Sequence, residues 1–100
     1  MDFKVIFEDA FIADLEAVVS SIAQHDRDAA YRLGNLIIRI AEGLSFFPER
    51  YPRLRRRPSI RRFVVKKYFK VFYRVQAHSR TVEILRCWDG RRGHDPFIPA

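Results

Sequence analysis

The chain has 100 residues, of which 48% are hydrophobic and 14% aromatic, and its formal net charge is +7. This length and hydrophobic content predict one folded domain spanning residues 1–100 and exclude a disordered basic tail. The single cysteine, Cys87, excludes an internal disulfide framework, and no stretch approaches the roughly 20 apolar residues that span a membrane. We therefore expect a soluble, cytoplasmic protein with no membrane partner.

The first half of the chain predicts a strand followed by two helices. Residues 3–7 alternate in the manner of a short strand, and residues 9–24 repeat their apolar side chains at helical spacing, with Asp9 as the expected N-cap. A second amphipathic helix is expected over residues 28–45. The short turn between the helices forces them to run antiparallel.

Two details of the second helix follow from single residues. Either Asp26 or Asp28 can cap its N-terminus, since a carboxylate accepts hydrogen bonds from the free backbone N–H groups there. Gly34 lies inside the helix, where glycine costs about 1 kcal/mol relative to alanine. We expect that Gly34 is offset by a close approach to the first helix.

The second half of the chain predicts three strands after a basic loop. Residues 48–58 contain three prolines and five arginines and are expected to form an irregular surface loop. The following residues alternate with a period of two, which predicts antiparallel strands near 60–66, 69–76 and 80–87. The fold class is therefore α+β, in the order β-α-α-β-β-β. A helical hairpin covers one face of a small, mainly antiparallel sheet, and the other face is expected to be solvated and polar.

The two halves of the chain carry opposite charge. Residues 1–49 hold four basic and nine acidic side chains, a net of −5, whereas residues 50–100 hold fifteen basic and three acidic ones, a net of +12. A field of this strength steers anionic partners to the basic half. The partner classes that this favours are a nucleic acid, a machine that acts on nucleic acid, or an acidic protein.

Arginine and lysine side chains of the predicted strands and tail form the candidate anion-binding surface. A guanidinium group matches phosphate or carboxylate in a planar fork, although charged strand residues often do no more than face solvent. The residues predicted to bind nucleic acid or another anion are Arg61, Arg62, Lys66, Arg74, Arg86 and Arg91.

Aromatic residues are interspersed among these cations. Phe69 and Tyr73 share a strand face with apolar neighbours and are expected in the core. Tyr68, Phe72 and Trp88 are the candidates for exposed rings on which bases could stack. Cys87, which lies between an arginine and a tryptophan, is interpreted as a half-buried strand residue, with a reactive thiol as the alternative.

Candidates for acid–base chemistry are few. RNA cleavage needs a base, an acid and cations for the phosphorane charge, and His94 in the basic tail has a side-chain pKa suited to proton transfer. Glu83 either acts as a base or pairs with a cross-strand arginine, and the pairing is favoured. His25 and His78 fall in expected turns and are interpreted as inert. Since no ligand spacing or phosphate-binding glycine loop is present, we expect no metal and no cofactor.

The basic half resembles the toxins of the RelE/ParE superfamily. The segments on which the resemblance rests are RFVVKKYFKVFYRV at residues 62–75 and VEILRCWDGRR at residues 82–92. The first half adds an approximate Ala-x-x-Asp-Leu element within residues 10–15 and Phe47-Pro48 near the end of the second helix. The resemblance covers nearly the whole chain, and the order and spacing of its motifs carry it.

This resemblance implies the toxin of a type II toxin–antitoxin module, held inactive in a hetero-oligomer with a separately encoded antitoxin. ParE-like members poison DNA gyrase, whereas RelE-like members cut mRNA on the ribosome with basic residues and a late tyrosine or histidine. For the nuclease branch, the resemblance implies Lys70, Arg92 and His94 as catalytic residues. The Arg-Cys-Trp-Asp-Gly-Arg-Arg ending and the long helical hairpin favour the ParE-like branch, with the ribosome-dependent endoribonuclease and a non-toxic anion-binding module as alternatives.

Overall fold

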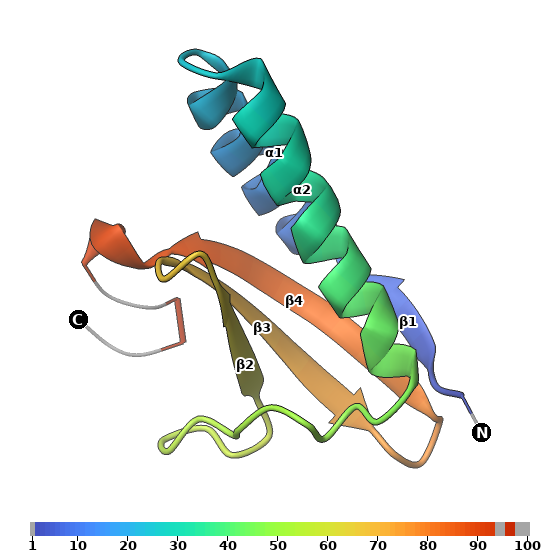
Figure 1. Cartoon of the computed structure of the whole chain (residues 1–100). Helices are drawn as coiled ribbons and strands as arrows, with labels where there is room; N and C mark the ends of the chain where they lie inside the picture. The colour runs from blue at the N-terminus through green and yellow to red at the C-terminus, as the bar shows by residue number, and fades with distance from the viewer. Residues whose placement is uncertain (1, 94–95, 98–100) are drawn as a thin grey trace.

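The computed structural model describes residues 2–93, 96 and 97, which form two α-helices and a four-stranded sheet (Figure 1). In chain order the elements are β1 (Lys4–Phe7), α1 (Asp9–Ala23), α2 (Arg27–Glu42), β2 (Arg61–Val65), β3 (Phe69–Gln76) and β4 (Thr81–Asp89). Short 3-10 turns, η1 (Gly43–Ser45) and η2 (Gly90–Arg92), follow α2 and β4. The predicted α+β fold and its element order are confirmed. None of the helices within these residues has the length and apolar character needed to cross a membrane.

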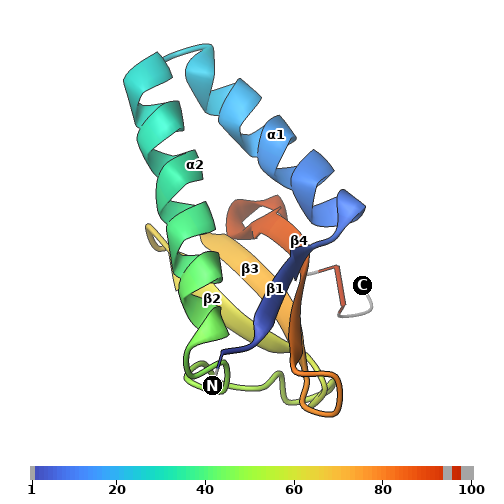
Figure 2. The same ribbon diagram turned by 90° about the vertical axis from the view of Figure 1, so that its right-hand side faces the viewer.

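The strands are ordered β1-β4-β3-β2 across the sheet (Figure 2). β1 pairs with β4 in parallel, while β2–β3 and β3–β4 are antiparallel. Between β3 and β4 the register shifts, because Phe72 pairs with Arg86 whereas Tyr73 pairs with Ile84. Leu85 is thus the extra residue of a β-bulge, and the bulge lets both Ile84 and Cys87 reach the core beneath the helices.

The two helices form an antiparallel hairpin whose turn projects well beyond the sheet (Figures 1 and 2). Asp26 caps α2, since its carboxylate accepts a hydrogen bond of 3.0 Å from the backbone N of Ala29. The predicted cap of the first helix is wrong: Glu8 is the N-cap residue, without a side-chain cap, and Asp9 is the first helical residue. The backbone N of Glu8 donates to the carbonyl of Ile84 at 3.0 Å, and this bond holds Glu8 in an extended conformation beside β4. The helix therefore begins at the next residue, Asp9.

Gly34 brings the helices together, as its position inside α2 predicted. A Cβ atom at this position would lie 3.2 Å from Cγ2 of Val19 on α1, closer than side chains usually pack. The missing side chain therefore sets how near the two helix backbones lie.

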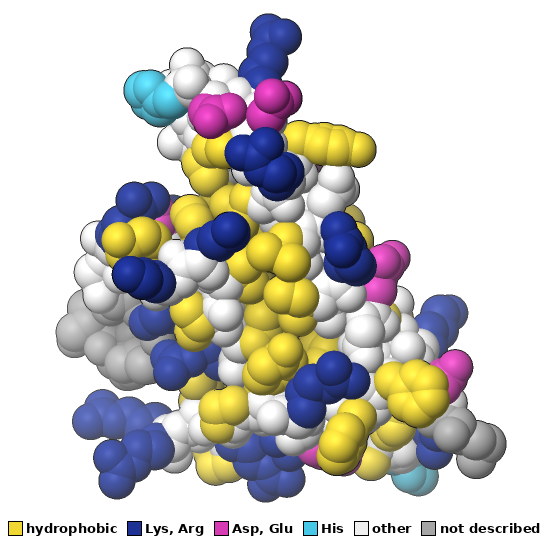
Figure 3. Space-filling model, viewed as in Figure 1, with side chains coloured by type: hydrophobic (Ala, Val, Ile, Leu, Met, Phe, Trp, Pro, Cys, Tyr) yellow, Lys and Arg dark blue, Asp and Glu magenta, His cyan; other side chains and the backbone are white. Residues whose placement is uncertain are grey.

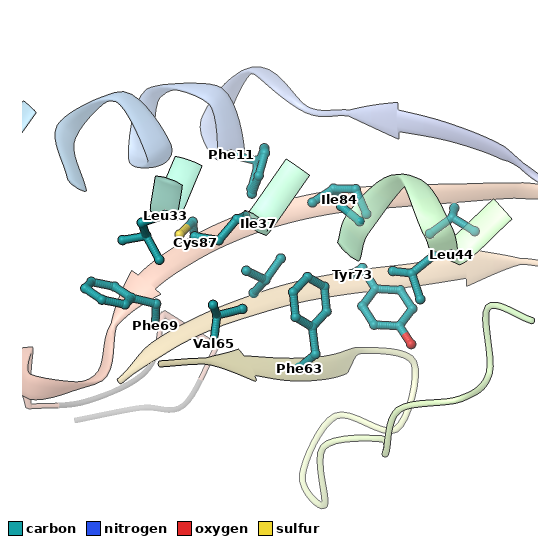
Figure 4. Packing of buried hydrophobic residues seen from close by; sticks show 13 residues of the cluster. Phe11, Leu33, Ile37, Leu44, Phe63, Val65, Phe69, Tyr73, Ile84 and Cys87 are labelled. Carbon is teal, nitrogen blue, oxygen red and sulfur yellow. The ribbon is translucent and has the colours of Figure 1, made fainter. Parts of the chain in front are cut away.

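The core lies between the hairpin and one face of the sheet (Figure 4). Its buried residues come from α1, α2, η1 and all three strands of the C-terminal half. The residues are Phe11, Leu33, Ile37, Ala41, Leu44, Phe63, Val65, Phe69, Val71, Tyr73, Val82, Ile84 and Cys87. The predicted burial of Phe69 and Tyr73 is confirmed, whereas Cys87, expected to be half-buried, is fully buried.

The opposite face of the sheet is not the solvated polar surface that the alternation predicted. Phe72 at its centre has no exposed surface, because Leu54 and Ile60 of the loop before β2 fold over it. Partly buried Trp88 and Phe97 extend this second cluster, and the Phe72 and Phe97 rings lie 5.2 Å apart. The predicted exposure of Phe72 is therefore wrong. By contrast, Tyr68 is 45% exposed, as predicted.

Candidate partner-binding surfaces

Arg86 joins the sheet to the first helix. Its Nε and Nη2 donate to the two carboxylate oxygens of Asp14 at 2.6 and 3.0 Å, and the backbone N of Cys87 donates to Asp14 Oδ2 at 3.1 Å. This two-point contact fits the planar guanidinium fork, and both side chains are partly buried. It gives Arg86 a structural role, and its anion binding stays a prediction.

Arg74 is engaged across the sheet by Glu83. The Nε of Arg74 lies 2.8 Å from Oε1 of Glu83, which also accepts from Gln76 at 3.2 Å. The hydrogen bond from Arg74 lowers the pKa of the Glu83 carboxyl. Of the two interpretations of Glu83, the cross-strand pair is confirmed.

Arg91 folds back on the residues before it. Its Nε and Nη2 donate to Asp89 at 2.9 and 2.7 Å, and its guanidinium lies 4.8 Å from the ring centre of Tyr68. The hydrogen bond from Arg91 holds the pKa of Asp89 below its usual range. Asp89 also accepts from the backbone N of Arg91 and so fixes the start of η2.

Arg61 fastens the loop that precedes β2. Its Nη1 donates to the backbone carbonyls of Glu49 and Tyr51 at 3.1 and 2.7 Å. Beside it, the buried Tyr73 hydroxyl donates to the carbonyl of Pro48 at 2.7 Å, and burial raises the pKa of Tyr73 to about 12. These contacts tie the start of the basic loop to β2 and β3.

Lys70 and Arg92, the pair implied for the nuclease branch, both border Trp88. Lys70 pairs with Trp88 in the β3–β4 register, which places their side chains on one face of the sheet. The Arg92 guanidinium lies 4.6 Å from the Trp88 ring centre. The structure thus brings these two cations to one aromatic ring. The third implied residue, His94, lies outside the described residues.

The last two predicted cations, Arg62 and Lys66, lie at different hollows of the surface. Arg62 lines a hollow formed by the basic loop, and Lys66 lines a groove beside α2. Lys66 adopts a φ of 54° in the turn between β2 and β3. The eight predicted site residues that the structure describes therefore do not form one common site.

Sequence reasoning missed an apolar groove along the helical hairpin. It measures about 480 Å³ and is lined mainly by small and aliphatic residues. The lining residues are Leu15, Val19, Ala23, Arg27, Ala30, Tyr31, Gly34, Asn35 and Ile38. The available signal was the width of the apolar stripes, since α1 and α2 carry aliphatic residues beyond the arc that faces the sheet.

A cationic groove of about 430 Å³ lies on the other side of α2. Arg32, Arg39 and Lys66 surround Leu33 and Leu36 there. Viewed as in Figure 1, hydrophobic side chains gather beside α2 with Lys and Arg on both sides of them (Figure 3). Tyr31 and Asn35 line both this groove and the apolar one, so the two are continuous across α2.

The described residues contain neither an accessible thiol nor a cluster of metal-ligating side chains. Cys87 is 2% exposed, and burial raises its pKa to about 12, so the reactive-thiol interpretation is wrong. Nowhere in residues 2–93, 96 and 97 do three histidine, cysteine or acidic side chains gather as a metal site.

Three solved structures share this fold. The chromosomal ParDE toxin–antitoxin system of P. aeruginosa matches with a TM-score of 0.71 and 18% identity over 87% of this chain and 95% of that one. The RelBE2 toxin–antitoxin complex of Mycobacterium tuberculosis gives 0.66 and 22%, covering 89% and 99%. The isolated E. coli RelE toxin gives 0.61 and 14%, covering 92% and 88%. At these identities the likeness establishes the fold alone.

The family is given by the sequence itself. No curated protein sequence is significantly similar to this chain. The family model described as the ParE toxin of the type II toxin–antitoxin system parDE, however, matches residues 5–93, which include both helices and all four strands. The chain therefore belongs to the ParE toxin family within the RelE/ParE superfamily of type II toxins.

Proposed function

We propose that this toxin acts in the cytoplasm by poisoning DNA gyrase and is neutralised in a hetero-oligomer with a cognate antitoxin. The observation that carries the proposal is the state of the strand cations. Arg61, Arg74 and Arg86 are engaged by the protein's own carboxylates and carbonyls. The sheet face opposite the helices is filled by a hydrophobic cluster around Phe72. This arrangement favours a surface that binds a protein over a cleft that cleaves RNA.

The antitoxin's proposed docking site is the surface of the helical hairpin. An apolar groove and a cationic groove lie side by side there and share Tyr31 and Asn35. An amphipathic segment with one aliphatic and one acidic side matches both grooves at once. The exposed Tyr31 and Ile12, at 64% and 44%, offer further apolar contact to such a segment.

Purified gyrase tests the proposed target directly. Incubated with gyrase, ATP and supercoiled plasmid, the toxin is expected to accumulate linear DNA that appears only after protein denaturation, as trapped cleavage complexes do. Prior addition of the protein encoded by the adjacent gene, as candidate antitoxin, is expected to suppress the linear product. Unchanged supercoiling and no linear DNA at a large excess of folded toxin would remove gyrase as the target.

The endoribonuclease remains the second candidate because Lys70 and Arg92 meet at Trp88. Two neighbouring cations can stabilise a phosphorane, although Glu83 is already paired with Arg74. A translating extract distinguishes the candidates: codon-specific mRNA cuts that disappear in the Lys70→Ala/Arg92→Ala variant would establish the nuclease. An inert result in both assays, with folded protein, would leave the non-toxic anion-binding module.

The docking site is tested by substitutions at the rim of the grooves. Tyr31→Glu places a negative charge where an acidic segment is expected to lie, and should abolish rescue of growth by the antitoxin while leaving toxicity intact. Lys4→Gln on β1, away from both grooves, is the matched surface control. Rescue that survives Tyr31→Glu would place the antitoxin elsewhere.

A further inference from the structure

Five arginines surround a hollow of about 370 Å³ formed by the loop before β2. The residues that line it are Pro52, Arg53, Leu54, Arg55, Arg56, Arg57, Arg62 and Phe97. No acidic residue is among them. The loop that forms it lies at the end of the molecule opposite the α1–α2 turn (Figure 1). None of its lining residues lines either groove of the helical hairpin, and neither Lys70 nor Arg92 is among them.

The loop around this hollow is an ordered structure held at both ends. The backbone N of Leu54 donates to the carbonyl of Ile60 at 2.8 Å, and the N of Ile60 donates to the carbonyl of Arg57 at 2.9 Å. A further bond of 3.1 Å joins the N of Arg62 to the carbonyl of Pro52. Leu54 and Ile60 are buried against Phe72. The backbone of the arginines between them is thus held in place before any partner arrives, which reduces the backbone entropy lost on binding.

Four arginines of the loop differ from the strand arginines, and from the loop's own Arg50, in what their side chains contact. Within the described part of the chain, the side chains of Arg53, Arg55, Arg56 and Arg57 form no hydrogen bond and no ion pair. Residues 55–57 are exposed, and like charges this close repel one another. A bound polyanion removes that repulsion. The ordered loop therefore has the charge and the shape of a site for phosphate groups.

We infer that this arginine hollow binds the phosphate backbone of duplex DNA. Arginine matches phosphate in a planar fork, and a duplex presents one negative charge per roughly 1.7 Å of its axis, a density suited to several adjacent arginines. A single strand binds best where several exposed rings stack its unpaired bases, whereas one aromatic residue, the partly buried Phe97, lines this hollow. The choice of DNA over RNA rests on the proposed function, because gyrase acts on duplex DNA.

The experiment measures binding of a fluorescent 20-base-pair duplex to the purified toxin, without gyrase, as salt is raised. The test variant is Arg55→Gln/Arg56→Gln/Arg57→Gln. It is expected to lose affinity roughly tenfold or more at low salt, and to lower the slope of log K against log salt by about 3, since each lost phosphate contact lowers it by about 1. The variant with lysine at the same three positions should keep most of the slope, because it keeps the charge.

A second triple variant, Arg27→Gln/Arg32→Gln/Arg39→Gln, removes the same charge from α2 and is expected to leave the slope within about 1 of the wild type. An equal loss in both triple variants would mean that net charge alone attracts the DNA, and would overturn the site. An unchanged slope in the loop variant would overturn it too, with folding checked by circular dichroism.

Competitors test the duplex assignment. Tighter binding of a single strand of equal length, or displacement of the duplex by poly-glutamate at lower charge concentration, would overturn the assignment to duplex DNA. Because gyrase is absent, failure here is separate from failure of the proposed target: a gyrase poison that does not bind DNA and a DNA-binding chain that does not trap gyrase give different pairs of results.

Discussion

The arginines of the strands and Arg55–Arg57 of the loop before β2 have the same side-chain chemistry but differ in what they contact. Arg61, Arg74 and Arg86 lie on strands and each donates to a carbonyl or carboxylate of the same chain. Arg55–Arg57 lie on a loop, and their side chains form no hydrogen bond or ion pair within the described residues. A net charge of +12 in one half of the chain therefore does not say which cations are available to a partner.

The largest effect is expected where a strand arginine is tied to a distant helix. Asp14→Ala removes both bonds to Arg86 and the acceptor of the Cys87 backbone N, leaving a half-buried charge without its partner. We expect unfolding free energy to fall by roughly 2–3 kcal/mol in urea denaturation. Asp14→Asn keeps an oxygen for the Cys87 N and should lose less. A loss below about 0.5 kcal/mol for Asp14→Ala would mean that Arg86 is not structural.

A smaller loss is expected where the loop is fastened. Tyr73→Phe removes the hydroxyl that donates to the Pro48 carbonyl and leaves that buried acceptor unpaired. The expected cost is about 1 kcal/mol by the same measurement. Tyr51→Phe, at a ring that packs on Phe63, serves as the control for loss of a hydroxyl. Equal stability of Tyr73→Phe and wild type would contradict this role of the hydroxyl.

The paired carboxylates predict an acid limb in stability. Arg74 and Arg91 lower the pKa values of Glu83 and Asp89 in the folded state. Their contribution is therefore present above the unfolded pKa values near 4 and is lost as pH falls through the lower folded values. In the Glu83→Gln/Asp89→Asn variant, the decline in melting temperature between about pH 5 and pH 2 should be shallower than in wild type. Parallel curves would exclude both pairs as its source.

The smallest effect on stability is expected in the loop. The side chains of Arg55, Arg56 and Arg57 form no ion pair or hydrogen bond within the described residues. Replacing all three with glutamine should therefore change the unfolding free energy by less than about 0.5 kcal/mol. A rise would fit the relief of repulsion between them. A loss near that of Asp14→Ala would erase the difference between the two sets of arginines.

The local hydrophobic pattern was enough to predict the helices and strands, because helical and strand periods involve residues that are close in the sequence. Partners far apart in the chain were not predictable in the same way. Asp14 and Arg86 are 72 residues apart, and only the fold brings them together. The bulge at Leu85 has no glycine to mark it, and the one apolar residue amid the loop arginines, Leu54, gave no periodicity that foretold its burial on Phe72. The candidate cations were therefore identified from the sequence, but which of them are engaged within the fold was not.

The target proposed for this toxin is gyrase and not the ribosome. Induced expression in a bacterial host, with translation and DNA integrity followed over the first minutes, tests it most directly when wild type and Lys70→Ala/Arg92→Ala are compared. The account predicts filamentation and DNA breaks with continuing translation, and a double variant that stays toxic. Prompt arrest of translation with mRNA cut at ribosome-bound codons, abolished in the double variant, would contradict it.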